Sequence, residues 1–137
     1  MFKDSEVEKV IKTALNKSIS EGVTLEDATN LAINEIFKNN TDITTFDEFG
    51  YFTRANKNPG TGNMFRGCSN LTSIDLSKLE YLPAYCFYGC SNLSGELNIP
   101  LLKGFVNNGN DSFRETKISK ISDLGVITYI PSSFFNS

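Results

Sequence analysis

The chain has 137 residues, with 13 Lys and Arg against 16 Asp and Glu, so its formal net charge is −3. This length and a hydrophobic content of 39% suit one globular domain or one short repeat array. The mild acidity and the lack of a basic stripe argue against a nucleic-acid binder. No apolar run reaches the roughly 18 residues that a membrane-spanning helix needs.

The chain has no histidine and three cysteines. It therefore cannot form a Ser-His or Cys-His nucleophile pair, and a structural zinc site normally takes four Cys or His ligands. We expect no metal, no cofactor and no enzyme activity. A carboxylate pair for glycoside cleavage stays open in principle, although a solvated acidic face explains equally well the acidic residues near the strands, namely Asp42, Asp47, Glu48, Asp75 and Glu96.

Two helices are expected at the N-terminus. Residues 5–21 carry apolar side chains at helical spacing, with a capping box from Ser5 to Glu8 and Gly22 as the stop. A second helix follows Thr24, which forms a capping box with Asp27, and it extends to about Phe37. Together they predict a helical hairpin. Either it caps the first apolar turn of an array, or it serves as an oligomerisation element.

Residues 43–53 alternate apolar and polar side chains, which predicts a short strand, and residues 54–63 have the turn chemistry of a loop.

A phrase built on phenylalanine then recurs along the chain. MFRGCSNLTSIDL returns as FYGCSNL from Phe87, and FRETKISKI from Phe113 is a shortened copy. The closing YIPSSFFNS repeats YLPAYCFYG, so that Phe135 corresponds to Phe87. The anchors are separated by 28, 22, 26 and 22 residues, which indicates a stacked repeat array; they are Phe37, Phe65, Phe87, Phe113 and Phe135.

The apolar positions of each repeat indicate which side chains are buried. We expect those that point inward to be Leu71, Ile74, Leu76, Leu93, Leu97, Ile99, Ile118 and Ile121. Cys68 and Cys90 occupy the same slot, so they should stack on adjacent turns. That spacing is within reach of a disulfide, but we expect buried, reduced thiols.

The phrases MFRGCSNLTSIDL and CFYGCSNLSGELNIP resemble the BspA-like leucine-rich repeats, over about residues 36–137. The stretch FKNNTDITTFDEFGYFT is similar to the lead-in of such repeats in proteins of gut bacteria and their bacteriophages. The resemblance implies an α+β repeat fold, a short leucine-rich-repeat solenoid with an N-terminal helical hairpin cap. The domains would be residues 1–40, the hairpin, and residues 41–137, the repeats.

The resemblance also implies surface recognition without catalysis. The expected ligand or partner face consists of outward strand positions, namely Thr44, Thr72, Ser73, Asp75, Ser94, Glu96, Asn98 and Ser119. The repeat phrase stops partway at FFNS, so we expect the apolar edge of the last turn to be covered by a neighbouring subunit or by further chain beyond Ser137. The candidate edge residues are Ile130, Phe134 and Phe135.

The expected function is a non-catalytic recognition or assembly module. Its partner would be another protein or a second copy, bound through the C-terminal edge or the N-terminal helices, with a surface glycan as a further ligand. Family members on cell surfaces usually begin with an export signal, which MFKDSEVEKV does not resemble. We therefore expect a virion-associated bacteriophage structural protein. The alternatives are a bacterial cell-surface adhesion module and a fragment of a carbohydrate-active enzyme.

Overall fold

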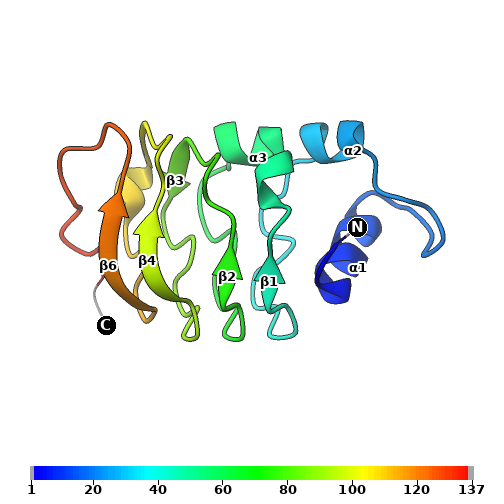
Figure 1. Ribbon diagram of the computed structural model, residues 1–137, viewed down its shortest axis with the longest axis horizontal. Helices are drawn as coiled ribbons and strands as arrows, with labels where there is room; N and C mark the ends of the chain where they lie inside the picture. Colours follow the sequence, from blue (N-terminus) through cyan, green and yellow to red (C-terminus); the bar gives the residue numbers. More distant parts are fainter. Residues whose placement is uncertain (1, 136–137) are drawn as a thin grey trace.

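The computed structural model describes residues 2–135 as a row of stacked turns of the chain. The helices are α1 (Ser5–Ala14), α2 (Leu25–Asn30) and α3 (Thr53–Lys57), with 3-10 turns η1 (Phe49–Tyr51) and η2 (Asn107–Gly109). The strands are β1 (Thr45–Phe46), β2 (Ser73–Ile74), β3 (Tyr81–Pro83), β4 (Ser94–Asn98), β5 (Gly104–Val106) and β6 (Lys117–Asp123). Helix α1 and strand β6 lie toward opposite ends of the long axis (Figure 1).

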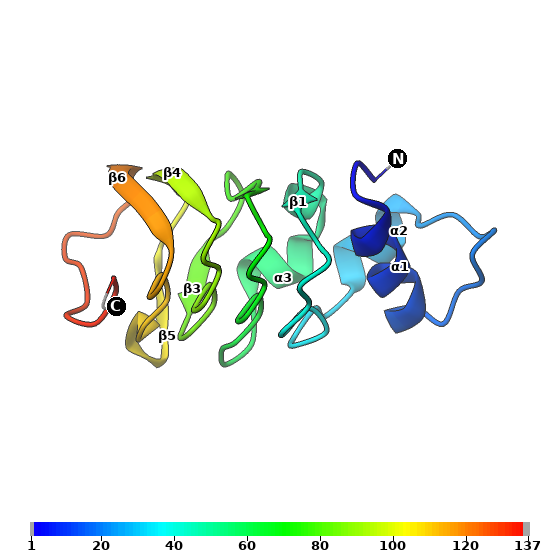
Figure 2. The ribbon, with the colours of Figure 1, turned by 90° about the horizontal axis from the view of Figure 1, so that it is seen from below.

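All the strand pairs are parallel within the described residues. Strand β1 pairs with β2, β4 with β6, and β3 with β5. Strands β1, β2, β4 and β6 follow one another along one side (Figure 1), while β3 and β5 lie on a second side (Figure 2). Each turn of the chain therefore runs in the same direction as the turn before it, as a repeat array requires.

The phenylalanine anchors form one ladder through the core. The ring centroids of Phe65 and Phe87 are 5.4 Å apart with 10° between the planes, and those of Phe87 and Phe113 are 5.2 Å apart at 14°. Phe37 extends the ladder at one end, 5.5 Å from Phe65, and Phe135 at the other, 6.0 Å from Phe113. The predicted register of all five anchors is confirmed, including the match of Phe135 with Phe87.

The backbone repeats the same register. The amide of Phe65 donates to Cys86 O at 2.8 Å, that of Phe87 to Ser112 O at 2.8 Å, and that of Phe113 to Phe134 O at 3.0 Å. In each case the acceptor residue immediately precedes the next anchor. Backbone hydrogen bonds and aromatic stacking therefore fix the same offset between successive turns.

Most of the predicted inward positions are buried, and the exception lies in the last turn. The buried ones are Leu71, Leu76, Leu93, Leu97 and Ile99, while Ile74 and Ile118 are half-buried. The prediction was wrong for Ile121, which is 39% exposed. Its strand is the outer one of its sheet, so no further strand among residues 2–135 covers it.

Helix α1 differs from the prediction at both ends. Its N-cap is Asp4, whose carboxylate accepts a hydrogen bond from Glu6 N at 2.9 Å, and not Ser5. It ends at Ala14 and not near Gly22, because Asn16 adopts a left-handed conformation with φ 58°. Asn16 N donates to Thr13 O and Lys17 N to Lys12 O, which is the Schellman arrangement that closes a helix.

The capping box that begins helix α2 is confirmed, but the helix is short. Asp27 N donates to Thr24 Oγ1 at 3.0 Å, and Thr24 N donates to Asp27 Oδ2 at 2.9 Å. Leu31 is already extended, with ψ 128°. The chain leaves the helix there, and Ile33 and Phe37 reach the core through turns. The predicted helical stripe through Phe37 was wrong.

Helix α3 was not predicted, because residues 54–63 read as a loop. Its buried Asn56 donates from Nδ2 to Phe49 O at 2.9 Å and to Phe52 O at 2.8 Å. The strand expected over residues 43–53 is limited to Thr45–Phe46. Asn56 ties the 3-10 turn to the helix, a contact that the alternation of apolar residues cannot reveal.

Asp4 joins α1 to the first repeat, and its substitution gives a pH-dependent prediction. Burial acts to raise the pKa of Asp4, but hydrogen bonds from Thr44 N, Thr45 N and Glu6 N outweigh it and hold the pKa below its ordinary value of 3.8. The ionised carboxylate therefore stabilises the fold above that ordinary pKa, and this stabilisation is lost as the pH falls through the lower folded value.

We expect Asp4→Ala to cost about 1–2 kcal/mol at pH 7, because the cap and its link to residues 44 and 45 are lost. Asp4→Asn keeps a capping side chain but removes the charge. Urea unfolding followed by circular dichroism should show the wild-type advantage over Asp4→Asn shrinking below about pH 4. A gap that stays constant down to about pH 2 would contradict the role of the charge.

Candidate functional site

The eight residues of the predicted ligand or partner face lie on or next to strands β1, β2, β4 and β6. Of its eight residues, all are exposed except Asp75, which is half-buried. Thr45 lies opposite Ser73, and Ser94 and Asn98 lie opposite Lys117 and Asp123. The strands that carry or adjoin these residues, β1, β2, β4 and β6, follow one another along one side of the molecule (Figure 1).

Several of these polar groups are already engaged between turns. Thr72 Oγ1 donates to Thr44 O at 3.0 Å, and Thr44 Oγ1 donates to Asp4 Oδ2 at 3.2 Å. Ser119 Oγ donates to Gly95 O at 3.5 Å, and Glu96 forms an ion pair with Lys120 at 3.4 Å. These side chains link neighbouring turns, which leaves Ser73, Ser94 and Asn98 as the exposed polar groups more open to a ligand.

A second set of links comes from asparagines that follow the serine in the repeat phrase. Asn70 Nδ2 donates to Thr41 O at 2.7 Å, and Asn92 Nδ2 donates to Ser69 O at 2.8 Å. Sequence reasoning did not assign these residues a role. Their recurrence in the Ser-Asn-Leu phrase was the available signal, since a side chain that bonds the previous turn must recur once per turn.

Tyr85 and Tyr88, which follow the turn at Pro83, are packed against arginines. The guanidinium of Arg66 lies 4.7 Å from the ring centroid of Tyr88 and 5.1 Å from that of Tyr85, and Arg114 lies 5.3 Å from Tyr88. Arg66, Tyr88 and Arg114 each follow a phenylalanine anchor on successive turns. This cation–π column links three turns, so Tyr88 contributes to packing between turns.

The cysteines are buried free thiols, as expected. Cys68 Sγ donates to Phe37 O at 3.0 Å, and Cys90 Sγ donates to Phe65 O at 3.0 Å, so the same slot makes the same contact on two turns. Burial raises the pKa of Cys68 to about 12, and it also raises the pKa of Cys86 and of Cys90. At neutral pH these thiols are protonated, so they lack the thiolate that nucleophilic chemistry requires.

The C-terminal edge carries a cluster of exposed apolar side chains. Ile130 is 42% exposed and Phe135 is 36% exposed, as predicted. Phe134 is fully buried, so its assignment to the edge was wrong. It occupies the slot of Cys86 and Ser112, and its ring packs against Phe135 at 5.0 Å and Phe105 at 5.8 Å.

Three further side chains belong to this edge and were missed by sequence reasoning. They are Ile121, Val126 (73% exposed) and Tyr129 (63% exposed). Ile121 also lines a hollow of about 310 Å³, together with Phe113, Phe135 and Ile118 of β6. We call Ile121, Val126, Tyr129, Ile130 and Phe135 the C-terminal edge.

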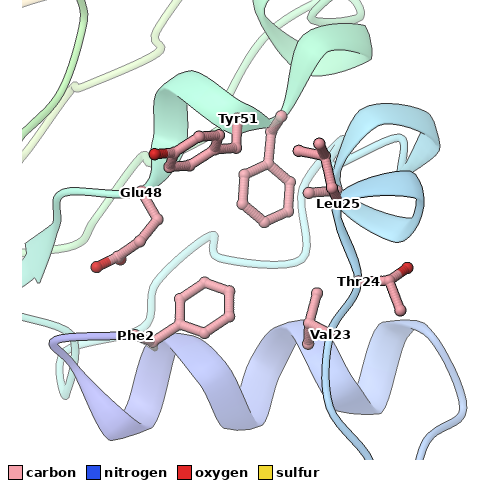
Figure 3. A pocket seen from close by; sticks show the side chains of 8 residues that line it. Phe2, Val23, Thr24, Leu25, Glu48 and Tyr51 are labelled. Carbon is pink, nitrogen blue, oxygen red and sulfur yellow. The ribbon is translucent and has the colours of Figure 1, made fainter.

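A second hollow, of about 340 Å³, lies between the N-terminal helices and the first repeat (Figure 3). Phe2, Val23 and Phe52 line it, and the exposed Leu25 and Tyr51 lie at its rim. Glu48 at its border accepts from the backbone amide of Lys3 at 3.1 Å. The hollow is an apolar seam between α1, α2 and η1.

The described residues hold no cluster of three His, Cys, Asp or Glu side chains that could bind a metal ion. Over residues 2–135 no helix is long and apolar enough to span a membrane.

Parallel turns, a stacked aromatic core and a recurring Gly-Cys-Ser-Asn-Leu phrase define a leucine-rich repeat protein. A family model for the BspA type leucine-rich repeat region matches residues 34–137 in six copies, so the chain belongs to this family. Searches of curated proteins and of solved structures gave no match. Leucine-rich repeats present extended surfaces and generally mediate protein interactions.

Proposed function

We propose that the chain is a non-catalytic protein-binding module whose C-terminal edge binds another protein subunit. The observation that carries this proposal is the concentration of exposed apolar side chains on the last turn. Of the nine large hydrophobic residues that are exposed within the described chain, five form the C-terminal edge. Exposed apolar side chains that gather at one end of a protein in this way indicate an interaction site.

A partner at the C-terminal edge would bury the apolar surface that Phe135 leaves exposed. Phe65, Phe87 and Phe113 occupy the same slot on inner turns and are at most 1% exposed, because each is covered on both sides. Phe135 packs against Phe113 and Phe134 and remains 36% exposed. A partner that supplies an apolar surface would complete the ladder, and burial of apolar area contributes about 25 cal/mol per Å².

The assembly that this module serves is, in our proposal, a bacteriophage particle. The support is the resemblance of residues 37–53 to the lead-in of repeats found in phages and gut bacteria. The N-terminal helices would then act as a cap. Val7, Ile11 and Ala28 support this role, since they are buried in one cluster with Phe37 and Phe46 of the first turns.

Adhesion through the strand face is a second candidate function. Ser73, Ser94 and Asn98 are exposed on successive strands, and such a row suits hydrogen bonding to a glycan or to a protein backbone. Binding of the purified chain to a glycan array, and its loss in a Ser73→Ala/Ser94→Ala/Asn98→Ala variant, would favour this function over assembly.

Site-specific photo-crosslinking tests the edge directly. Tyr129→p-benzoylphenylalanine places the probe on the C-terminal edge, and Leu101→p-benzoylphenylalanine places it on an exposed apolar residue outside the edge. In cells that produce the assembled particles, we expect one discrete crosslinked protein from position 129 and none from position 101. Absence of a crosslink at 129, or equal crosslinking at both positions, would contradict the proposal.

A further inference from the structure

The outer strand of the C-terminal turn is unusually long for this molecule. Strand β6 spans seven residues and pairs with β4 on one side only, and no strand among residues 2–135 occupies its other side. An outer strand presents a row of backbone N–H and C=O groups that can pair with another chain. The backbone groups of β6 can therefore fix the direction in which a partner strand pairs with the C-terminal edge.

The strand also carries features that restrict what can pair with it. Ser119 and Ser122 are bulged relative to β4, and Ser122 Oγ donates to Leu97 O at 3.3 Å. Lys117 and Lys120 are exposed on the same strand. Bulges and lysines protect an edge from unselective pairing, so a partner must match both the shape and the charges of this strand.

The charges match a second β6 in the opposite direction. Lys117 pairs with the exposed Ser94 in the ladder, and Asp123 pairs with the exposed Asn98, so both charged side chains lie on the outward face. In an antiparallel pair centred on Lys120, Lys117 of one strand lies opposite Asp123 of the other, and this contact occurs twice. Opposite charges directly across two strands are favourable.

Both side chains are available for this contact. Lys117 Nζ donates to Asn92 Oδ1 at 3.3 Å, which leaves further donors on the ammonium group. Asp123 Oδ1 accepts from Gly125 N at 2.9 Å, which leaves the second carboxylate oxygen. Lys120 would meet its own copy at the centre, and its ion pair with Glu96 at 3.4 Å reduces the repulsion there.

Other registers lose this complementarity. A shift of one position sets Lys117 opposite Leu124 or Ser122, and parallel pairing sets Lys117 opposite Lys117. In the antiparallel arrangement the two copies also present the same apolar residues to each other, as an isologous two-fold contact requires. Ile121 and Phe135 of both copies would leave water together.

We propose that the partner at the C-terminal edge is a second copy of this chain, docked about a two-fold axis with the β6 strands antiparallel and Lys117 facing Asp123 of the other copy. This inference rests on the proposed function, because it names the subunit that the edge binds.

Charge reversal tests the proposed register. Lys117→Asp and Asp123→Lys each place two like-charge pairs in the dimer, and the double variant Lys117→Asp/Asp123→Lys restores two opposite-charge pairs. Sedimentation equilibrium of the full chain should show a wild-type dimer, a dissociation constant raised roughly ten- to a hundredfold by each single reversal, and recovery to within roughly threefold in the double variant. Lys9→Asp, an exposed reversal on α1, is the matched control and should leave the dimer unchanged.

The outcomes separate this inference from the function on which it rests. A wild-type chain that stays monomeric at millimolar concentration overturns it, as does a dimer that both single reversals leave intact. Failure of the double variant to recover, while its circular dichroism shows a folded chain, overturns the antiparallel register. A monomer that still gives a discrete crosslink to a different protein from position 129 would leave the protein-binding function standing without the dimer.

Discussion

Phe87→Ala should lower the free energy of unfolding by about 3–5 kcal/mol, as expected for removal of a fully buried phenylalanine. Phe87 stacks between Phe65 and Phe113 at 5.4 Å and 5.2 Å, and it is fully buried. Its removal leaves a cavity at the middle of the ladder, and the turns on either side cannot close it, because their backbones are hydrogen-bonded in register.

Urea unfolding followed by circular dichroism measures this effect, since the chain has no tryptophan to report by fluorescence. The midpoint of thermal unfolding should fall by roughly 10–20 °C. Phe135→Ala is the matched control at the end of the ladder. Its side chain is 36% exposed, so the loss should be well under half of that at Phe87. Equal losses at both positions would argue against the ladder as the main source of stability.

Gly67→Ala is expected to destabilise the fold by about 2–4 kcal/mol, for two separable reasons. Gly67 has φ +78°, a left-handed conformation that costs other residues about 1–2 kcal/mol. An added Cβ would also overlap the side-chain oxygen of Asn39 and lie 3.2 Å from its Cα. The Asn39 side chain can rotate, but its backbone is held by the hydrogen bond from Asn39 N to Arg66 O at 2.7 Å.

Gly89→Ala measures the cost of the left-handed backbone conformation without the contact to Asn39. Gly89 occupies the same slot on the next turn with φ +79°, and the nearest atom to its added Cβ is Gly67 Cα at 3.6 Å, an ordinary contact. We expect a loss of about 1–2 kcal/mol from this variant. The difference between the two variants, measured by urea unfolding at one pH, reports the contact with Asn39. If both variants lose the same stability, Asn39 does not constrain this turn.

The repeat register is the part of the fold that the sequence predicted well. Phe37, Phe65, Phe87, Phe113 and Phe135 lie where their spacing placed them, and Cys68 and Cys90 make the same contact on adjacent turns. A slot that recurs once per turn must meet its own copies, so spacing alone carries this information.

The helix boundaries and the candidate site were predicted less well. The apolar stripe of residues 5–21 continues past Ala14, but the left-handed Asn16 ends the helix, and a stripe does not reveal backbone conformation. Most residues of the predicted strand face are exposed, but the sequence did not show that the hydroxyl groups of Thr72 and Ser119 donate to the previous turn. That depends on distances between turns, which residue types alone leave undefined.

By itself, the sequence determined that this protein is a stacked array with phenylalanine and cysteine slots and no histidine chemistry, because these properties depend on residue identity and period. Only the tertiary structure decided which apolar residues remain exposed. Leu97 and Ile121 lie opposite each other in the same sheet, and Leu97 is buried while Ile121 is not. The physical reason is position in the stack: a side chain is buried only where another turn of the chain covers it, and among residues 2–135 the turn that contains β6 has such a neighbour on one side alone.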